Sequence, residues 1–267
     1  MIKKLSLSLA ATAFVFCASA QNSQQSSAAT ISPAGRTTVV VPFSPRLYNN
    51  QDSRKMCEVS GMEYHQLGNY IRESFDSVLN AQMRDSINVI RLISSTTSGT
   101  ANELETIYNI SKYQFADRPK ALEDKSKFAM IRDQRAPKAK PASSAKGNGI
   151  HNGEIVTQRV DNTNRFMNVQ FDDAEYIQSI IQKYGAKYFL FITQFDILGD
   201  YSNPYLVGEM RYPRTIKVHY SIFSADGTFI TGDFESYQFF AYENNITEIV
   251  RNYFPTIAKN IAHKLPR

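Results

Sequence analysis

The feature that most restricts the fold of this chain is an uninterrupted apolar run, YFLFI, at residues 188–192. It begins shortly after Gly185 and gives way to an alternating pattern beyond Thr193, as expected where the strand leaves full burial. A membrane-spanning helix needs about 20 apolar residues, whereas a strand buried on both faces of a sheet needs only a short continuous run. The run therefore predicts the central strand of a covered sheet. The alternatives are the wall of a ligand pocket and a membrane element.

The remaining elements follow from hydrophobic periodicity along the chain. Helical spacing of apolar residues predicts helices at 65–84, from residue 101 onwards, at 172–184 and at 246–265. β-Branched or alternating runs predict strands at 37–43, 87–93, 154–160, 165–171 and 229–242. The segment at 44–65 has turn formers and no clear period, and we interpret it as a loop. Together these elements predict an α/β fold, a mixed sheet with amphipathic helices packed on it and one long basic insertion.

A further strand is predicted at 216–222, where apolar and polar residues alternate. The apolar set is Ile216, Val218, Tyr220 and Ile222, and the polar set is Lys217, His219 and Ser221. Strict alternation is typical of a half-buried strand, so the polar set is expected on the solvent side. The Asp-Gly pair at 226–227 predicts a tight hairpin turn into the strand at 229–242.

Local signals mark the ends of the predicted helices. Asp172 can cap one helix, with Glu175 three residues later in a capping-box arrangement. Gly185 stands where a left-handed C-cap is expected. Pro255 should kink or restart the last helix, because proline donates no amide hydrogen bond and clashes with the preceding turn.

The N-terminus has the pattern of a signal peptide. Lys3 and Lys4 form a basic start, LSLSLAATAFVF is a short apolar region, and the small residues Ala18 and Ala20 precede Gln21. We expect cleavage after Ala20, and hence export to the periplasm or outer envelope, or secretion. The alternative is a short N-terminal membrane anchor, and no transmembrane segment is expected in the mature chain.

Cys17 raises a second processing route, acylation of a lipoprotein cysteine. The bulky Phe16 before it disfavours that route, since such signals have a small residue there. Cleavage after residue 20 would leave Cys57 without an intramolecular partner, and we expect its thiol to be buried. Residues 21–36 are polar and small, which predicts a disordered tether before a single α/β domain at 37–265.

The charge of the chain is concentrated in one segment. Residues 118–146 carry nine basic side chains and three acidic ones. The surrounding stretch, about 116–153, lacks large apolar residues in its second half, so we expect a charged, partly disordered insertion. Its candidate contacts with an anionic partner are Lys138, Lys140 and Lys146. Export makes nucleic acid an unsuitable partner, and the alternative is a solvated loop with no partner.

The sequence contains none of the common catalytic or nucleotide-binding motifs. There is no G-x-S-x-G, P-loop, G-x-G-x-x-G or H-E-x-x-H pattern. The histidines are far apart and in different predicted elements; they are His65, His151, His219 and His263. The carboxylates at strand ends and turns are Asp172, Asp173, Asp196, Asp200, Asp226 and Asp233. A Cys57–His65 pair lacks an orienting third group. We therefore predict no catalytic residue, no metal site and no cofactor.

The order of elements resembles a family of bacterial envelope proteins. The family includes the curli-secretion lipoprotein, the penicillin-binding-protein activators and the TolB amino-terminal domain. The matching positions are Pro42-Phe43 at the end of a first strand, Gly185-Ala186 before a hydrophobic strand, with Lys187 in place of the family's acid, and the Asp226-Gly227 turn. The likeness covers 37–93 and 166–265, and the stretch between has no counterpart.

The resemblance implies an α/β envelope domain that works by contacting other proteins, without catalysis of its own. The expected function is therefore a non-enzymatic exported envelope protein that binds an envelope protein or assembles with itself. The alternative is a hydrolase that acts on cell-wall or extracellular polymer. A pocket of converging carboxylates would favour the hydrolase, whereas an exposed sheet edge or apolar patch would favour the binding protein.

Overall fold

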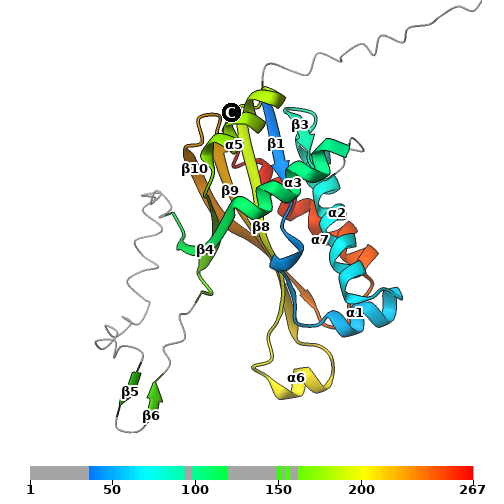
Figure 1. Ribbon diagram of the computed structural model, residues 1–267. Helices are drawn as coiled ribbons and strands as arrows, with labels where there is room; N and C mark the ends of the chain where they lie inside the picture. The colour runs from blue at the N-terminus through cyan, green and yellow to red at the C-terminus, as the bar shows by residue number, and fades with distance from the viewer. Residues whose placement is uncertain (1–35, 94–97, 120–148, 152–153, 157–161, 267) are drawn as a thin grey trace, which may run out of the picture. The chain divides into compact units, whose positions relative to one another are not determined.

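The structure, a computed structural model, describes residues 36–93, 98–119, 149–151, 154–156 and 162–266 (Figure 1). Its main sheet has the strand order β10-β9-β8-β1-β3, and β2 also pairs with β8. The strands are β1 (Thr37–Val41), β2 (Tyr48–Asn50), β3 (Asn88–Arg91), β8 (Tyr188–Gly199), β9 (Pro213–Ser224) and β10 (Phe229–Phe240). The sheet is mixed, because β1 runs parallel to β3 and β8 while β8, β9 and β10 are antiparallel. The predicted α/β class is confirmed.

The apolar run at 188–192 forms the first half of β8, in the middle of this sheet. Its five side chains are all buried, and β1 and β9 flank it. Both faces are covered because each carries its own hydrophobic cluster. The predicted central strand is confirmed.

Two helices cover one face of the sheet, α2 (Tyr64–Met83) and α7 (Ile246–Ala262), which lie together in Figure 1. They form the α2/α7 core, which includes Ile71, Phe75, Leu190, Phe195, Val218 and Phe254. The first turn of α2 is fixed by a capping box between Glu63 and Gln66. α7 continues through Pro255 and does not restart there.

The other face is covered by α3 (Ser98–Ile110), α5 (Ala174–Tyr184) and the antiparallel pair of β4 (Ser111–Asp117) and β7 (Arg165–Phe171). They form the α3/α5 core, which includes Val39, Leu104, Ile107, Ile180, Phe189, Phe191 and Phe223. At the start of α5 the prediction was wrong by one residue. Asp173, not Asp172, caps the helix by accepting a hydrogen bond from the backbone N–H of Tyr176. Gly185 ends the helix with a φ of 57°, as predicted.

The predicted loop at 44–65 was wrong as well. It contains a short 3-10 helix η1 (Pro45–Leu47), the strand β2 and the helix α1 (Ser53–Ser60). α1 buries only Met56, so its sequence has no apolar period that could reveal it. β2 is three residues long and pairs with the second half of β8.

Several predictions fall partly or wholly outside the described residues. Those outside are the signal peptide with Ala18, Ala20 and Gln21, most of the tether, and the insertion's Lys138, Lys140 and Lys146. At the end of the predicted insertion, β5 (Gly149–His151) pairs with β6 (Glu154–Val156), so 149–151 is a strand where we expected a loop, and β6 lies in the strand predicted at 154–160. A last short helix, α6 (Pro204–Gly208), lies between β8 and β9. Among the described residues, no helix has the length and apolarity to cross a membrane.

Candidate functional site

A β-bulge in the middle of β8 separates two pairing registers with β9. Ile192 lies opposite Tyr220, and Gln194 lies opposite His219, so Thr193 is an extra residue without a partner across the ladder. The Thr193 hydroxyl donates a buried hydrogen bond of 2.5 Å to the carbonyl oxygen of Met167 on β7. Bulges of this kind change the direction in which the following side chains point.

Beyond the bulge, the odd-numbered side chains of β8 lie on the opposite face of the sheet from the odd-numbered side chains before it. Before it, Phe191 packs in the α3/α5 core; after it, Phe195 packs in the α2/α7 core on the opposite face. In an unbroken strand, two residues four positions apart would share a face. Because of the exchange, Gln194 and Asp196 lie on the face covered by β4 and β7 and line a cavity there.

We call this cavity, which has a volume of about 530 Å³, the polar cavity. It lies over the second half of β8 and the paired parts of β9 and β10, and Phe115 of β4 lines it as well. The polar residues that matter for its chemistry are Gln194, Asp196, Asp200, Lys217, His219 and Ser236. Its size is within the roughly 300–1,000 Å³ that is usual for small-molecule sites.

His219 is fully buried and both of its ring nitrogens have partners. The backbone N–H of Met167 donates to Nδ1 at 2.9 Å, so the proton of the neutral ring lies on Nε2 and is donated to Oδ2 of Asp196 at 3.2 Å. Burial lowers the pKa of His219 below its ordinary value of 6.5, and the neighbouring Asp196 opposes this effect only partly. The imidazole is therefore neutral at pH 7 and has no nitrogen available to take a proton from a substrate.

Asp196 is held by a second donor from its own strand. The Gln194 side-chain amide donates to both carboxylate oxygens, at 2.8 and 2.9 Å. Across the ladder, the Lys217 ammonium donates to the carbonyl oxygen of Thr163 at 2.9 Å and lies 3.9 Å from the ring centroid of Phe234. The buried polar groups are thus fixed by the fold around them.

These contacts correct the predicted half-buried strand. Lys217, His219 and Ser221 are buried, although their alternation with apolar residues indicated a solvent-facing set. The reason is that β7 crosses this face, where the Asn168 side chain accepts a hydrogen bond from Ser221 and the Met167 amide bonds His219. A second layer therefore covers β9 on its polar side.

The candidate carboxylates named from the sequence do not converge on one site. Only Asp196 and Asp200 of that set line the polar cavity. Asp233 of β10 binds the guanidinium of Arg118, and Asp226 makes the hairpin turn, where Gly227 has a φ of 80°. Asp172 pairs with Lys112.

The remaining candidate residues do not form a site. Cys57 is half-buried, and burial raises the pKa of its thiol, the opposite of what an activated nucleophile requires. His65 is exposed. Within the described ranges, no group of three or more His, Cys, Asp or Glu side chains could hold a metal ion.

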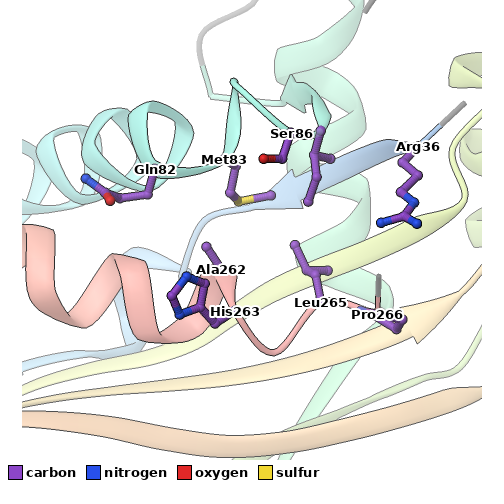
Figure 2. A pocket seen from close by; sticks show the side chains of 9 residues that line it. Arg36, Gln82, Met83, Ser86, Ala262, His263, Leu265 and Pro266 are labelled. Carbon is purple, nitrogen blue, oxygen red and sulfur yellow. The ribbon is translucent and has the colours of Figure 1, made fainter. Parts of the chain in front are cut away.

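A second cavity, of about 330 Å³, lies where α2 and α7 end beside the start of β1 (Figure 2). Its basic side chains are Arg36 and His263, which stand apart in Figure 2 with Met83 and Leu265 between them. Among the described residues that line this cavity, none carries a carboxylate. It lacks the converging polar groups of a ligand site.

One edge of the main sheet is open. In the described chain, β10 has β9 on one side and no strand on the other. The exposed apolar side chains on or next to this strand are Phe229, Ile230, Tyr237, Phe240 and Tyr242. Phe240 and Tyr242 stack, with ring centroids 5.5 Å apart. Sequence reasoning predicted the strand but not its position at the edge.

The outward backbone groups of β10 are blocked at two points. The Phe234 N–H donates to the Asp233 carboxylate at 2.8 Å, and the Phe240 N–H donates to the Glu243 carboxylate at 3.3 Å. Neither amide can therefore point to β9. Because direction alternates along an antiparallel ladder, the amides of Ser236 and Gln238 point outward too. We call the stretch 236–238 the free edge.

Comparison with protein-family models, with curated proteins and with solved structures finds no match for this chain.

Proposed function

We propose that the protein is a non-enzymatic, exported envelope protein that assembles by pairing the free edge of β10 with the same edge of a second copy. The observation that carries the proposal is the long edge strand, in which the outward amides of Ser236 and Gln238 lie between two blocked positions and several exposed side chains are aromatic. Open edges of this kind are templates for strand pairing unless they are blocked.

The sequence of β10 fits an antiparallel pairing with itself. If Tyr237 lies on the two-fold axis, Ser236 of one copy is opposite Gln238 of the other, and their outward amides and carbonyls form the hydrogen-bonded pairs. In that register Phe234 lies opposite Phe240, whose amides the acidic side chains already occupy.

The charges along the strand also fit this register. Glu235 lies opposite Phe239, and Asp233 lies opposite Ala241, so no carboxylate faces another across the new ladder. Like charges directly opposite each other destabilise a strand pair, and aromatic pairs stabilise it. A second copy can therefore pair with the free edge without like-charge repulsion, which supports a second copy as the binding partner.

The polar cavity is one place where a hydrolase could act, because Asp196 and Asp200 both contribute carboxylates to it. Two features count against that use. Asp196 accepts hydrogen bonds from Gln194 and His219, and His219 has no nitrogen available as a base. A general acid or base must be able to exchange its proton with the substrate.

Proline at position 238 tests the proposal. The change removes an outward N–H without breaking the ladder to β9, since proline is tolerated on an edge strand where its nitrogen faces solvent. Multi-angle light scattering should show a dimer of the mature protein that becomes a monomer in Gln238→Pro. The matched control is Gln238→Thr, which keeps the N–H and should remain a dimer.

Two results would contradict the proposal. A wild-type protein that stays monomeric up to high concentration has no such self-pairing, and the edge would then be open to a strand of another protein. A dimer that survives in a folded Gln238→Pro variant must use another surface. Export is tested separately by the intact mass of the exported protein, which should begin at Gln21, whereas a lipid adduct on Cys17 would contradict it.

A further inference from the structure

A further cavity, of about 360 Å³, lies just beyond the carboxyl end of β1, and we call it the η1/α3 cavity. Its lining comes from Ser44 and the three residues of η1, from the last turns of α3 and from the start of β4. The chain continues from β1 to β3 on one side of β1, whereas β8 pairs with the other side. In open α/β sheets, ligands bind outside the carboxyl ends of the strands at such a change of direction.

The Ser44 side chain carries a hydroxyl group that the fold does not use. Ser44 directly precedes η1, where serine commonly caps a helix, yet its side chain makes no capping hydrogen bond. The residue is only 7 % exposed and lines the η1/α3 cavity. Its hydroxyl has no hydrogen-bond partner in the described chain, and it is not one of the unpartnered side-chain atoms that are closed off from solvent. The hydroxyl is therefore accessible to a ligand in the cavity, both as a donor and as an acceptor.

The backbone around Ser44 is held in place by its neighbours. The Tyr108 hydroxyl of α3 donates to the carbonyl oxygens of Pro42 and Phe43, at 2.7 and 3.2 Å. Burial raises the pKa of Tyr108, so this hydroxyl remains a donor at neutral pH. Pro45 restricts the residue before it to extended backbone, and Ser44 has a ψ of 139°. The wall of the cavity is thus formed before any ligand binds, as is usual for small-molecule sites.

Two opposite charges line the same cavity, and the described chain neutralises neither of them. Arg46 of η1 and Glu105 of α3 are both exposed, and neither forms an ion pair with a described residue. Glu105 shares a face of α3 with Tyr108 and Asn109, which follow it by three and four residues and line the cavity as well. A ligand that complements this lining carries an anionic group for Arg46 and a cationic group for Glu105.

Apolar surface beside these charges can receive the carbon skeleton of a ligand. It is formed by Pro45, Leu47 and the ring of Tyr108. Small-molecule sites combine such walls with a few polar groups that fix the orientation of the ligand, and their volumes are roughly 300–1,000 Å³. The η1/α3 cavity is near the lower limit of that range, which favours a small ligand.

From this arrangement we infer that the η1/α3 cavity binds a free α-amino acid with an apolar side chain. The carboxylate of the ligand accepts hydrogen bonds from Arg46 and Ser44, and its ammonium group donates to Glu105. A guanidinium group matches the two oxygens of a carboxylate, which makes arginine well suited to this role. No covalent step is involved. The site does not use β10, so this inference and the proposed self-pairing can fail independently.

The probe is leucine, titrated into the ¹⁵N-labelled mature protein at pH 7 and followed by NMR. Two analogues each lack one of its charges: N-acetylleucine has no ammonium group, and leucinamide has no carboxylate. Leucine should shift the amide signals around Ser44 and Glu105, and each analogue should bind about 10-fold more weakly. Ser44→Ala should weaken the binding of leucine about 3-fold.

The charge variants test which group of the ligand each residue recognises. Glu105→Gln should remove the preference for leucine over N-acetylleucine, and Arg46→Gln should remove the preference over leucinamide. Both residues are exposed, so the variants should fold as the wild type does. The matched controls are Glu209→Gln and Arg211→Gln, which change exposed charges outside the cavity and should leave both preferences intact.

Three results would overturn the inference. The first is that leucine causes no shift at about 10 mM. The second is that N-acetylleucine or leucinamide binds the wild type as tightly as leucine does. The third is that Arg46→Gln and Glu105→Gln bind leucine with the wild-type affinity, because binding would then occur at another place on the protein.

Discussion

Nε2 of His219 lies 3.2 Å from Oδ2 of Asp196, and this contact joins two neighbouring strands beneath the layer formed by β4 and β7. The direction of the hydrogen bond is determined by a third strand. The Met167 amide of β7 occupies Nδ1, so Nε2 must be the donor. His219 therefore connects β7, β8 and β9 in its neutral form.

The stability of the fold should consequently fall in mild acid. The pKa of His219 is below 6.5 in the folded protein because of burial, whereas in the unfolded chain the ring binds a proton near pH 6.5. The contribution of neutral His219 to the free energy of unfolding is present above pH 6.5 and is lost as the pH falls through the folded pKa. Urea unfolding at about pH 8 and about pH 5.5 should show a larger loss in the wild type than in His219→Gln.

The glutamine variant keeps both hydrogen bonds, since its amide can accept from Met167 and donate to Asp196. The exposed His263 supplies the control, because His263→Gln should keep the wild-type pH dependence. Equal losses in the wild type and in His219→Gln would show that His219 does not set this dependence.

The burial of His219 could not be predicted from its own strand. The alternation at 216–222 correctly identified β9, but alternation reports only one covered face. The cover on the other face comes from β4 and β7, which are far from β9 in sequence. The sequence of β4 nevertheless contains a strand pattern, because half-buried Tyr113 and Phe115 alternate with exposed Lys112 and Gln114. We assigned no strand there.

A second buried charge, on Arg214, should make Asp52 important for stability. The Arg214 guanidinium is fully buried and donates to Oδ2 of Asp52 at 2.7 Å, and Tyr212 donates to Oδ1 at 2.7 Å. Asp52→Ala would leave a buried cation without its counter-charge, and we expect a loss of about 3–5 kcal/mol in the free energy of unfolding. Urea denaturation measures this loss.

The matched control is Glu58→Ala in α1, whose ion pairs with Arg54 and Lys55 are exposed. It should unfold at nearly the wild-type urea concentration. Similar losses in the two variants would mean that the Asp52–Arg214 pair adds nothing beyond a surface ion pair.

Removing the bulge at Thr193 should leave the faces of β8 unchanged. Ile192 already lies opposite Tyr220 and Gln194 opposite His219, so deleting Thr193 joins two neighbouring pairs into a regular ladder and keeps Gln194, Phe195 and Asp196 on their present faces. We expect the deletion variant to unfold cooperatively at a somewhat lower temperature, because it loses the buried hydrogen bond from Thr193 to Met167. Thr193→Ala, which keeps the extra residue but loses the same hydroxyl, is the control and should show a similar loss. A deletion variant that has no cooperative thermal unfolding would be inconsistent with these faces.

The bulge also shows the limit of sequence reasoning at the site. The apolar run correctly predicts full burial at 188–192, but the alternating pattern beyond Thr193 predicts that the strand leaves full burial there, which is wrong. A one-residue insertion and a loss of burial produce the same sequence pattern. The structure separates them, because Phe195 and Ile197 are fully buried on the α2/α7 side.

Amide hydrogen exchange along β10 tests the central proposal most directly. The amides of Ser236 and Gln238 should exchange rapidly in dilute solution and become protected as the concentration rises, because they bond the second copy. The amide of Tyr237, which faces β9, should be protected at every concentration. A Ser236 amide that stays equally fast at concentrations where the protein is a dimer would contradict pairing through the free edge.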